Sequence, residues 1–86
     1  MIHARTDYQR IQDPTGKIPQ DEPVFLLRGQ DSLAPEMLEI YALAAHKAGA
    51  SPALVDSVYK HAQAMRKWQT EHTVKVPDMP EGVGRY

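Results

Sequence analysis

The chain has 86 residues, 10 basic and 11 acidic side chains, a formal net charge of −1 and no cysteine. The missing cysteines exclude a disulfide framework and a thiolate metal site. The balanced charge argues against a general nucleic-acid-binding protein, which usually carries a basic excess.

The first 22 residues predict an extended or turn region. The segment Asp13–Gly16, Asp-Pro-Thr-Gly, is typical of a tight turn, because proline presets φ at the second position and glycine accepts a positive φ. Residues 8–12 and 17–18 on either side of it would then form a short hairpin, although their alternation of polar and apolar residues is weak.

Residues 23–30 hold the best strand candidate, with its apolar part at 23–28. The run Val24–Leu27 is bounded by acidic residues with Pro23 before it and by Gly29 after it. Four consecutive apolar residues predict burial on both faces, or burial on one face and an interface on the other. One turn of buried helix fits the same pattern.

Residues 33–48 predict a helix. Pro35 suits the first helical turn, where the missing N–H costs nothing. Asp31 or Ser32 would cap the start, and Gly49 suits the left-handed position that ends a helix. At about 100° per residue, the apolar positions cover one broad arc. They are Met37, Leu38, Ile40, Tyr41, Ala42, Ala44, Ala45 and Ala48.

A second helix is predicted over 52–71. Ser51 is a favoured N-cap and Pro52 a favoured first helical residue. The apolar core stripe would contain Leu54, Val55, Val58, Ala62 and Met65. Because only a few residues connect the two helices, they should pack as antiparallel neighbours.

The segment 73–86 is rich in proline and glycine and predicts an irregular tail. Val74 and Val76 would allow a short edge strand in it. The expected fold is therefore mainly α with a small β part (α+β). It consists of a short N-terminal strand or hairpin, an antiparallel two-helix hairpin and the C-terminal tail, all within one domain, 1–86.

The first candidate site is Arg28, Gln30 and Asp31, where the expected strand gives way to a helix. Arg28 follows four apolar residues, so we expect it to be partly desolvated and paired. Arg28 and the helix N-terminus together would bind an anion such as a phosphate. In the alternative interpretation, Arg28 pairs with a neighbouring carboxylate, and Asp31 only caps the helix. Gly29 has no further glycines at Walker or Rossmann spacing, which argues against those nucleotide loops.

The second candidate site lies on the long helix. Tyr59 and Arg66 are seven residues apart on one side of the core stripe, and His61 and Trp68 have the same spacing on the other side. A base would stack on Tyr59 or Trp68 while Arg66 meets a phosphate. Alternatively, these residues border the core or a subunit interface, where aromatic residues and arginine are enriched.

No sequence pattern indicates catalysis. The four histidines form no His-x-x-x-His pair and no His-Glu-x-x-His motif, so we expect no metal. The serines lack a glycine-flanked nucleophile elbow. The sequence therefore predicts a protein that is not an enzyme and carries no cofactor.

The stretch Pro19–Pro35, PQDEPVFLLRGQDSLAP, resembles a segment of small proteins from bacteriophages and prophages. The resemblance continues more loosely as far as Ala50, so it covers about half of the chain. It implies a phage accessory protein that acts in the cytoplasm of a bacterial host. Such proteins often antagonise host defences, either by sequestering nucleotide signals or by blocking a defence protein.

Two functions remain open at this point. In the first, the chain forms a homo-oligomer and binds a small anionic ligand such as a signalling nucleotide between subunits. In the second, it is a protein-interaction module that inhibits or adapts a host protein, suggested by Leu43 on a polar helix face and by the proline-rich tail. Self-association is expected because a chain of this size buries only about 60–65% of its unfolded surface. No apolar run approaches the roughly 18 residues of a membrane span.

Overall fold

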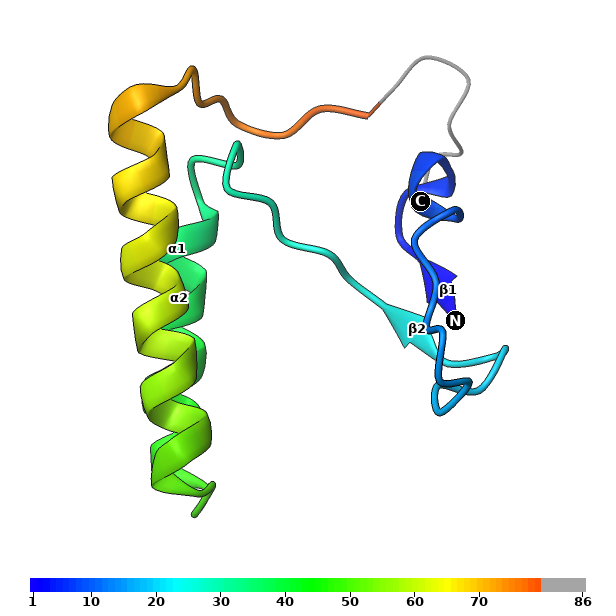
Figure 1. Cartoon of the computed structure of the whole chain (residues 1–86), viewed down its shortest axis with the longest axis horizontal. Helices are drawn as coiled ribbons and strands as arrows, with labels where there is room; N and C mark the ends of the chain where they lie inside the picture. Colours follow the sequence, from blue (N-terminus) through cyan, green and yellow to red (C-terminus); the bar gives the residue numbers. More distant parts are fainter. Residues whose placement is uncertain (80–86) are drawn as a thin grey trace. The chain divides into compact units, whose positions relative to one another are not determined.

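A computed structural model describes residues 1–79 of the chain. The elements follow in the order β1 (Ile2–His3), a 3₁₀ helix (Thr6–Tyr8), β2 (Pro23–Val24), α1 (Ala34–Lys47) and α2 (Pro52–Glu71) (Figure 1). The described residues divide into two compact units, one formed by 1–26 with 78–79 and the other by 27–77. The expected mainly helical fold with a short N-terminal β part is confirmed. No helix within residues 1–79 is long and apolar enough to span a membrane.

In the N-terminal unit, β1 and β2 form a two-stranded parallel sheet that pairs Ile2 with Pro23 and His3 with Val24. The terminal amine of Met1 donates to the Pro19 carbonyl at 2.6 Å. The buried His3 ring places Nε2 2.6 Å from the Ile11 carbonyl. Single hydrogen bonds from the first three residues thus anchor this unit around its small sheet.

The turn Asp13–Gly16 is present, but the hairpin expected around it is not. Gly16 adopts a φ of 67°, and its N–H donates to the Asp13 carbonyl. The Asp13 carboxylate accepts hydrogen bonds from the backbone N–H groups of Thr15, Lys17 and Ile18. Because this side chain takes the donors that a ladder would use, the chain cannot pair as strands here.

The predicted strand 23–30 is wrong in its length, since β2 contains only Pro23 and Val24. Its partner β1 offers two residues for pairing, so the ladder ends there. Phe25 is 73% exposed, which contradicts the expected burial of this apolar run on both faces.

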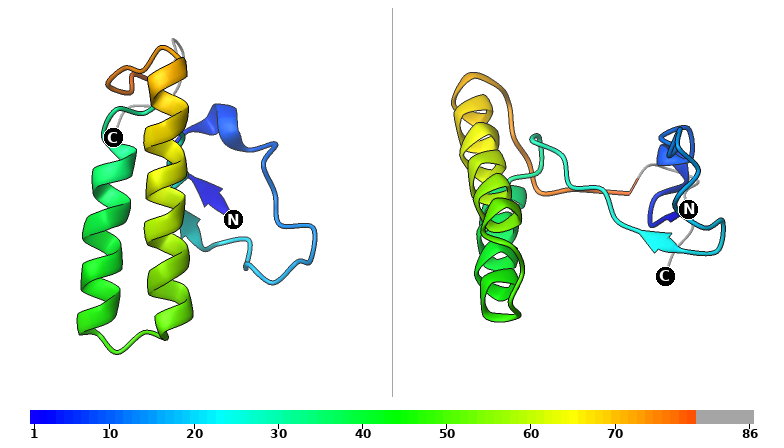
Figure 2. Two further views of the ribbon diagram at one scale, coloured as in Figure 1. Left: turned by 60° about the vertical axis from the view of Figure 1, so that its left-hand side comes forward. Right: turned by 60° about the horizontal axis from the view of Figure 1, so that its bottom comes forward.

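The two helices pack side by side and are joined by a short connection (Figure 2). The predicted range 52–71 matches α2, and α1 lies within the predicted 33–48. Ser51 accepts a hydrogen bond from the Leu54 N–H at 3.2 Å, and Gly49 has a φ of 84°. Ser51, Gly49 and the two prolines therefore marked helix ends correctly. The expected cap of α1 by Asp31 or Ser32 is wrong, because the N-cap is Leu33 and makes no side-chain cap hydrogen bond.

The helical core is narrow and made mostly of alanine. Ala34, Ala42 and Ala62 are fully buried, and Met65 is 8% exposed. The predicted apolar arc of α1 is wider than the face that α2 covers, because one neighbouring helix shields only part of such an arc. Most of the arc is exposed, namely Met37, Ile40, Tyr41, Ala44 and Ala48. Leu54, expected in the α2 core stripe, is also 41% exposed.

After α2, the chain returns along the segment that precedes α1. Lys75 forms a parallel bridge with Asp31. The Lys75 N–H donates to the Gln30 carbonyl at 3.0 Å, and the Ser32 N–H donates to the Lys75 carbonyl at 2.9 Å. The edge strand expected at 74–76 is therefore reduced to a single bridge. The part of the predicted tail from residue 80 onward lies outside the described residues.

Candidate functional site

The loop before α1 is fixed to the C-terminal end of α2. The Gln69 side-chain amide donates to the carbonyls of Gly29 and Asp31, both at 2.9 Å. These bonds are partly buried, and the bridge to Lys75 holds the same loop from its other side. The backbone of the loop is therefore held by two separate segments.

Asp31 serves the loop itself. Its carboxylate accepts a hydrogen bond from the Leu33 N–H at 2.8 Å, and its carbonyl accepts one from the Ala34 N–H at 3.1 Å. This arrangement satisfies backbone donors at the start of α1. The structure thus places the Asp31 carboxylate in a local turn that leads into α1, and not in the N-cap position, which Leu33 occupies.

Trp68 lies beside this loop near the end of α2. The His72 ring stacks on the indole with a centroid separation of 3.9 Å and an angle of 4° between the planes. The Nδ1–H of His72 donates to the Trp68 carbonyl at 2.8 Å, which fixes the ring in place. Since His72 occupies one face of the indole, Trp68 can offer a ligand at most its other face.

Gly29 approaches the same indole from the loop. A Cβ atom built on Gly29 would lie 3.5 Å from Cε3 and 3.7 Å from Cδ2 of Trp68. A side chain at this position would therefore touch the indole, so the loop backbone passes close to it. Gly29 and Trp68 both line the pocket described next.

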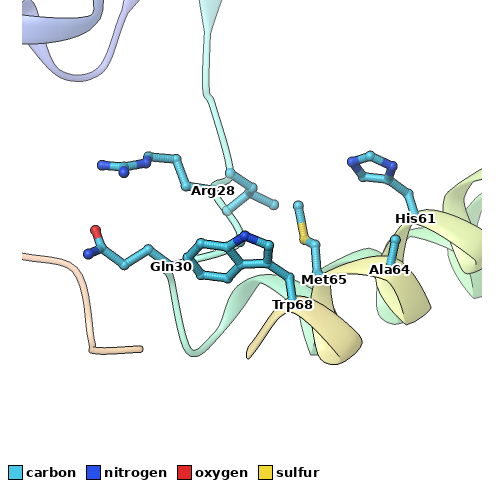
Figure 3. A pocket seen from close by; sticks show the side chains of 8 residues that line it. Arg28, Gln30, His61, Ala64, Met65 and Trp68 are labelled. Carbon is cyan, nitrogen blue, oxygen red and sulfur yellow. The ribbon is translucent and has the colours of Figure 1, made fainter. Parts of the chain in front are cut away.

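The site is a pocket of about 410 Å³ between the loop and α2 (Figure 3). Apolar side chains form much of its lining, and three polar side chains, those of Arg28, Gln30 and His61, stand at its margin. The lining residues are Leu27, Arg28, Gly29, Gln30, His61, Ala64, Met65 and Trp68. Such a combination can hold a flat apolar body while hydrogen-bonding groups fix its polar edge.

The structure places the six predicted ligand-binding residues in three different settings. Arg28, Gln30 and Trp68 line the pocket, whereas the Asp31 carboxylate bonds the backbone of its own loop. Tyr59 and Arg66 lie on the opposite flank of α2, because nine residues at about 100° each separate Tyr59 from Trp68 by half a turn.

Arg66 is engaged on that opposite flank. Its guanidinium donates to the Glu39 carboxylate of α1, and both side chains are partly exposed. Arg66 and Trp68 therefore do not converge on one ligand, as the second candidate site required. The spacing of seven residues grouped Tyr59 with Arg66 and His61 with Trp68 correctly, but it could not place the pairs on one surface.

Gln69 and His72 are structural contributors to the site that sequence reasoning missed. Gln69 continues the core stripe through Val58, Ala62 and Met65 at helical spacing. A polar residue in that register was the available signal for a partly buried amide with backbone partners. The His72 stack follows the i, i+4 spacing from Trp68, which brings side chains together on a helix.

The described residues were also compared with the side-chain arrangements that hold metal ions. No group of three or more histidine, aspartate or glutamate side chains within residues 1–79 is arranged to hold a metal ion. Comparisons of this chain with protein-family models, with curated proteins and with solved structures found no match.

Proposed function

We propose that this protein is a non-enzymatic binding protein whose pocket holds a small, planar, anionic ligand of the nucleotide type. The observation that carries the proposal is the convergence of Arg28, Gln30 and Trp68 on one pocket. In a phage accessory protein, the same binding would serve counter-defence by sequestering a signalling nucleotide.

Each polar group at the pocket has a distinct task in this proposal. Gln30 carries both an amide donor and a carbonyl acceptor, which suits the edge of a base. Arg28 has five N–H donors, so it can meet a phosphate and keep another contact at the same time. His61 lies two turns before Trp68 on the same side of α2 and supplies a second ring at the opposite end of the pocket.

The pocket dimensions narrow the ligand class. A volume of about 410 Å³ lies near the small end of the range of about 300–1,000 Å³ that is usual for ligand sites. One indole face is already covered by His72, so stacking with a single ring system is the most that Trp68 provides. A mononucleotide with one phosphate fits these limits better than a ligand with two bases.

Trp68 is the sole tryptophan of the chain, so its intrinsic fluorescence reports on the pocket without a label. Titration with adenosine and guanosine monophosphates and their 3′,5′-cyclic forms should quench the emission saturably. Unphosphorylated adenosine should bind more weakly, because a charge-assisted hydrogen bond contributes about 1.5–3 kcal/mol. Arg28→Ala should weaken nucleotide binding roughly tenfold or more for the same reason.

Arg66→Ala is the matched control, since it removes an arginine from the same unit but outside the pocket. It should leave the dissociation constant unchanged. The variant Trp68→Phe has no tryptophan fluorescence, so its binding is measured by calorimetry. It should still bind the nucleotides more tightly than adenosine. Absence of both quenching and heat with every nucleotide at millimolar concentration would refute the proposed function. Equal losses in the two arginine variants would refute the assigned site.

A protein-interaction module is the second candidate, favoured by the exposure of Leu43. This side chain is 50% exposed and lies on the polar side of α1, where a leucine has no role in the hairpin core. The candidate predicts a host defence protein that binds the wild-type chain, binds Leu43→Glu much more weakly and binds Arg28→Ala normally. Binding that survives Leu43→Glu would remove the observation on which this candidate depends.

A further inference from the structure

Gln69 bridges two carbonyls of the loop at residues 28–31. Its amide nitrogen carries two N–H donors, and it donates to the carbonyls of Gly29 and Asp31, both at 2.9 Å. These two carbonyls flank Gln30, whose side chain lines the pocket. Gln69 therefore fixes the backbone on both sides of Gln30 to α2.

The other two carbonyls of the loop are paired as well. The Gln30 carbonyl accepts the N–H of Lys75, in the segment that follows α2, at 3.0 Å. The Arg28 carbonyl accepts the Asp31 N–H at 3.0 Å, which closes a turn between these two residues. The loop backbone is thus held in place before any ligand arrives, and prior order of this kind lowers the cost of binding.

The helix that holds the loop also carries the indole of the pocket. Trp68 and Gln69 are neighbours near the C-terminal end of α2. The side chains of Arg28 and Gln30 extend from the loop beside the indole (Figure 3). One residue of α2 supplies the ring of the pocket, and the next residue holds the loop that supplies the polar groups. The bonds of Gln69 consequently set the position of Arg28 relative to the indole.

We propose that Gln69 is a positioning residue that gives the pocket its preference for a phosphorylated ligand. This role rests on the proposed function, and it names the residue on which the selectivity of that function depends. A nucleoside needs the indole and the side chain of Gln30, whereas a nucleotide must also reach Arg28 with its phosphate. Both ends of a nucleotide bind together at little cost only if the loop and the helix keep a fixed separation. Gln69 does not line the pocket and acts through Arg28.

The test compares the preference between two ligands and not affinity alone. Titration of the Trp68 fluorescence gives dissociation constants for adenosine monophosphate and adenosine, and the wild type should favour the monophosphate roughly tenfold or more. Gln69→Ala should lower this preference about threefold or more, because Arg28 must then be ordered at the moment of binding. Partial unfolding would not imitate this result, since it weakens the binding of both ligands by the same factor.

A second variant separates the amide donors from the bulk of the side chain. Gln69→Met lacks the donors but keeps a side chain of similar length, so it should lower the preference as much as Gln69→Ala. It also serves if the alanine variant does not fold. Gln63→Ala is the matched control, since Gln63 is an exposed glutamine of the same helix, and it should keep the wild-type preference. Circular dichroism checks that each variant has the helical content of the wild type.

The outcomes for Gln69 and for the proposed function are distinguishable. Saturable binding in the wild type, with an unchanged preference in both Gln69 variants, would overturn the role of Gln69 and leave the proposed function intact. An equal loss of affinity for both ligands would show that Gln69 only supports the fold, and it would overturn the role too. A wild type that binds no nucleotide would refute the proposed function and this role with it.

Discussion

Each of the two compact units of this chain is stabilised internally by a different kind of interaction. In residues 27–77, two helices of 14 and 20 residues repeat the same small contacts along their length. In residues 1–26, the strands have two residues each, and single hydrogen bonds hold the surrounding chain. The Met1 amine donates to the Pro19 carbonyl, and the Asp13 carboxylate accepts from three backbone N–H groups. Repeated contacts leave a periodic pattern in the sequence, whereas individual contacts do not.

Among these predictions, we expect the largest loss of folding stability from a side chain that is too large for the helical core. Ala62→Leu inserts a larger side chain at a fully buried position opposite α1, where the alanines permit close approach. Overpacking of this kind costs about 1–3 kcal/mol, a large share of the stability of a small domain. Urea denaturation followed by circular dichroism measures it. Ala53→Leu, at an exposed position of the same helix, should change stability little, and equal losses would show that Ala62 is not a packing constraint.

Loss of the Gln69 amide should have the next largest effect. Gln69→Ala removes two partly buried hydrogen bonds to the loop carbonyls, each worth about 0.5–1.5 kcal/mol. Hydrogen exchange of the backbone amides at 29–32 should accelerate because the loop loses its anchor on α2. Gln63→Ala removes an exposed glutamine from the same helix and should leave the exchange unchanged. Unaltered exchange in Gln69→Ala would show that the bridge to Lys75 alone holds the loop.

Removal of the α2 cap should cost less. Ser51→Ala deletes the side-chain acceptor for the Leu54 N–H, and such substitutions typically cost about 1 kcal/mol. Ser57→Ala, in the exposed interior of α2, should have no comparable cost and should slightly favour the helix. A difference between these two variants in urea midpoint therefore isolates the cap from the general effect of replacing serine.

We expect the smallest change in stability from protonation of Asp13, because it affects only the turn Asp13–Gly16 of the N-terminal unit. The Thr15 hydroxyl, followed by the backbone N–H groups of Ile18, Thr15 and Lys17, lowers the pKa of Asp13 from 3.8 to about 2. The stabilisation from these bonds is fully present above pH 3.8 and is lost as the pH falls through about 2. NMR titration of the Asp13 carboxyl should give this low value, and Thr15→Val should raise it. A wild-type value near 3.8 would show that the turn is not held by this carboxylate.

The bounds of the two helices were predictable because capping residues mark the same ends that the packed hairpin has. Ser51 and Pro52 marked the start of α2, and Gly49 marked the end of α1, as side-chain chemistry requires. The N-terminal unit was predictable only at Asp13–Gly16, where turn chemistry is local. The pairing of Ile2 with Pro23 depends on residues 21 positions apart with no repeating pattern, so the sequence offered no signal for it.

The candidate site was predictable in part. Arg28, Gln30 and Trp68 were identified by residue type, and the pocket brings them together. Tyr59 and Arg66 were chosen for the same chemistry but lie on the other flank of α2. Helical spacing alone gives the angle between residues on one helix, but it does not say which flank meets the loop before α1. That choice depends on the Gln69 amide, whose partners are 38 and 40 residues away.

Arg5 contacts a residue far away in the sequence, and this separation affects the order in which the chain folds. Its guanidinium donates to the carbonyl of Asp78, 73 residues along the chain, at 2.7 Å. The helices, by contrast, contact each other across a connection of a few residues, and local contacts form faster than distant ones. We expect the helical hairpin to form first and the Arg5 contact to close last. In stopped-flow refolding, Arg5→Ala should leave the helical phase unchanged, and a slower helical phase would contradict this order.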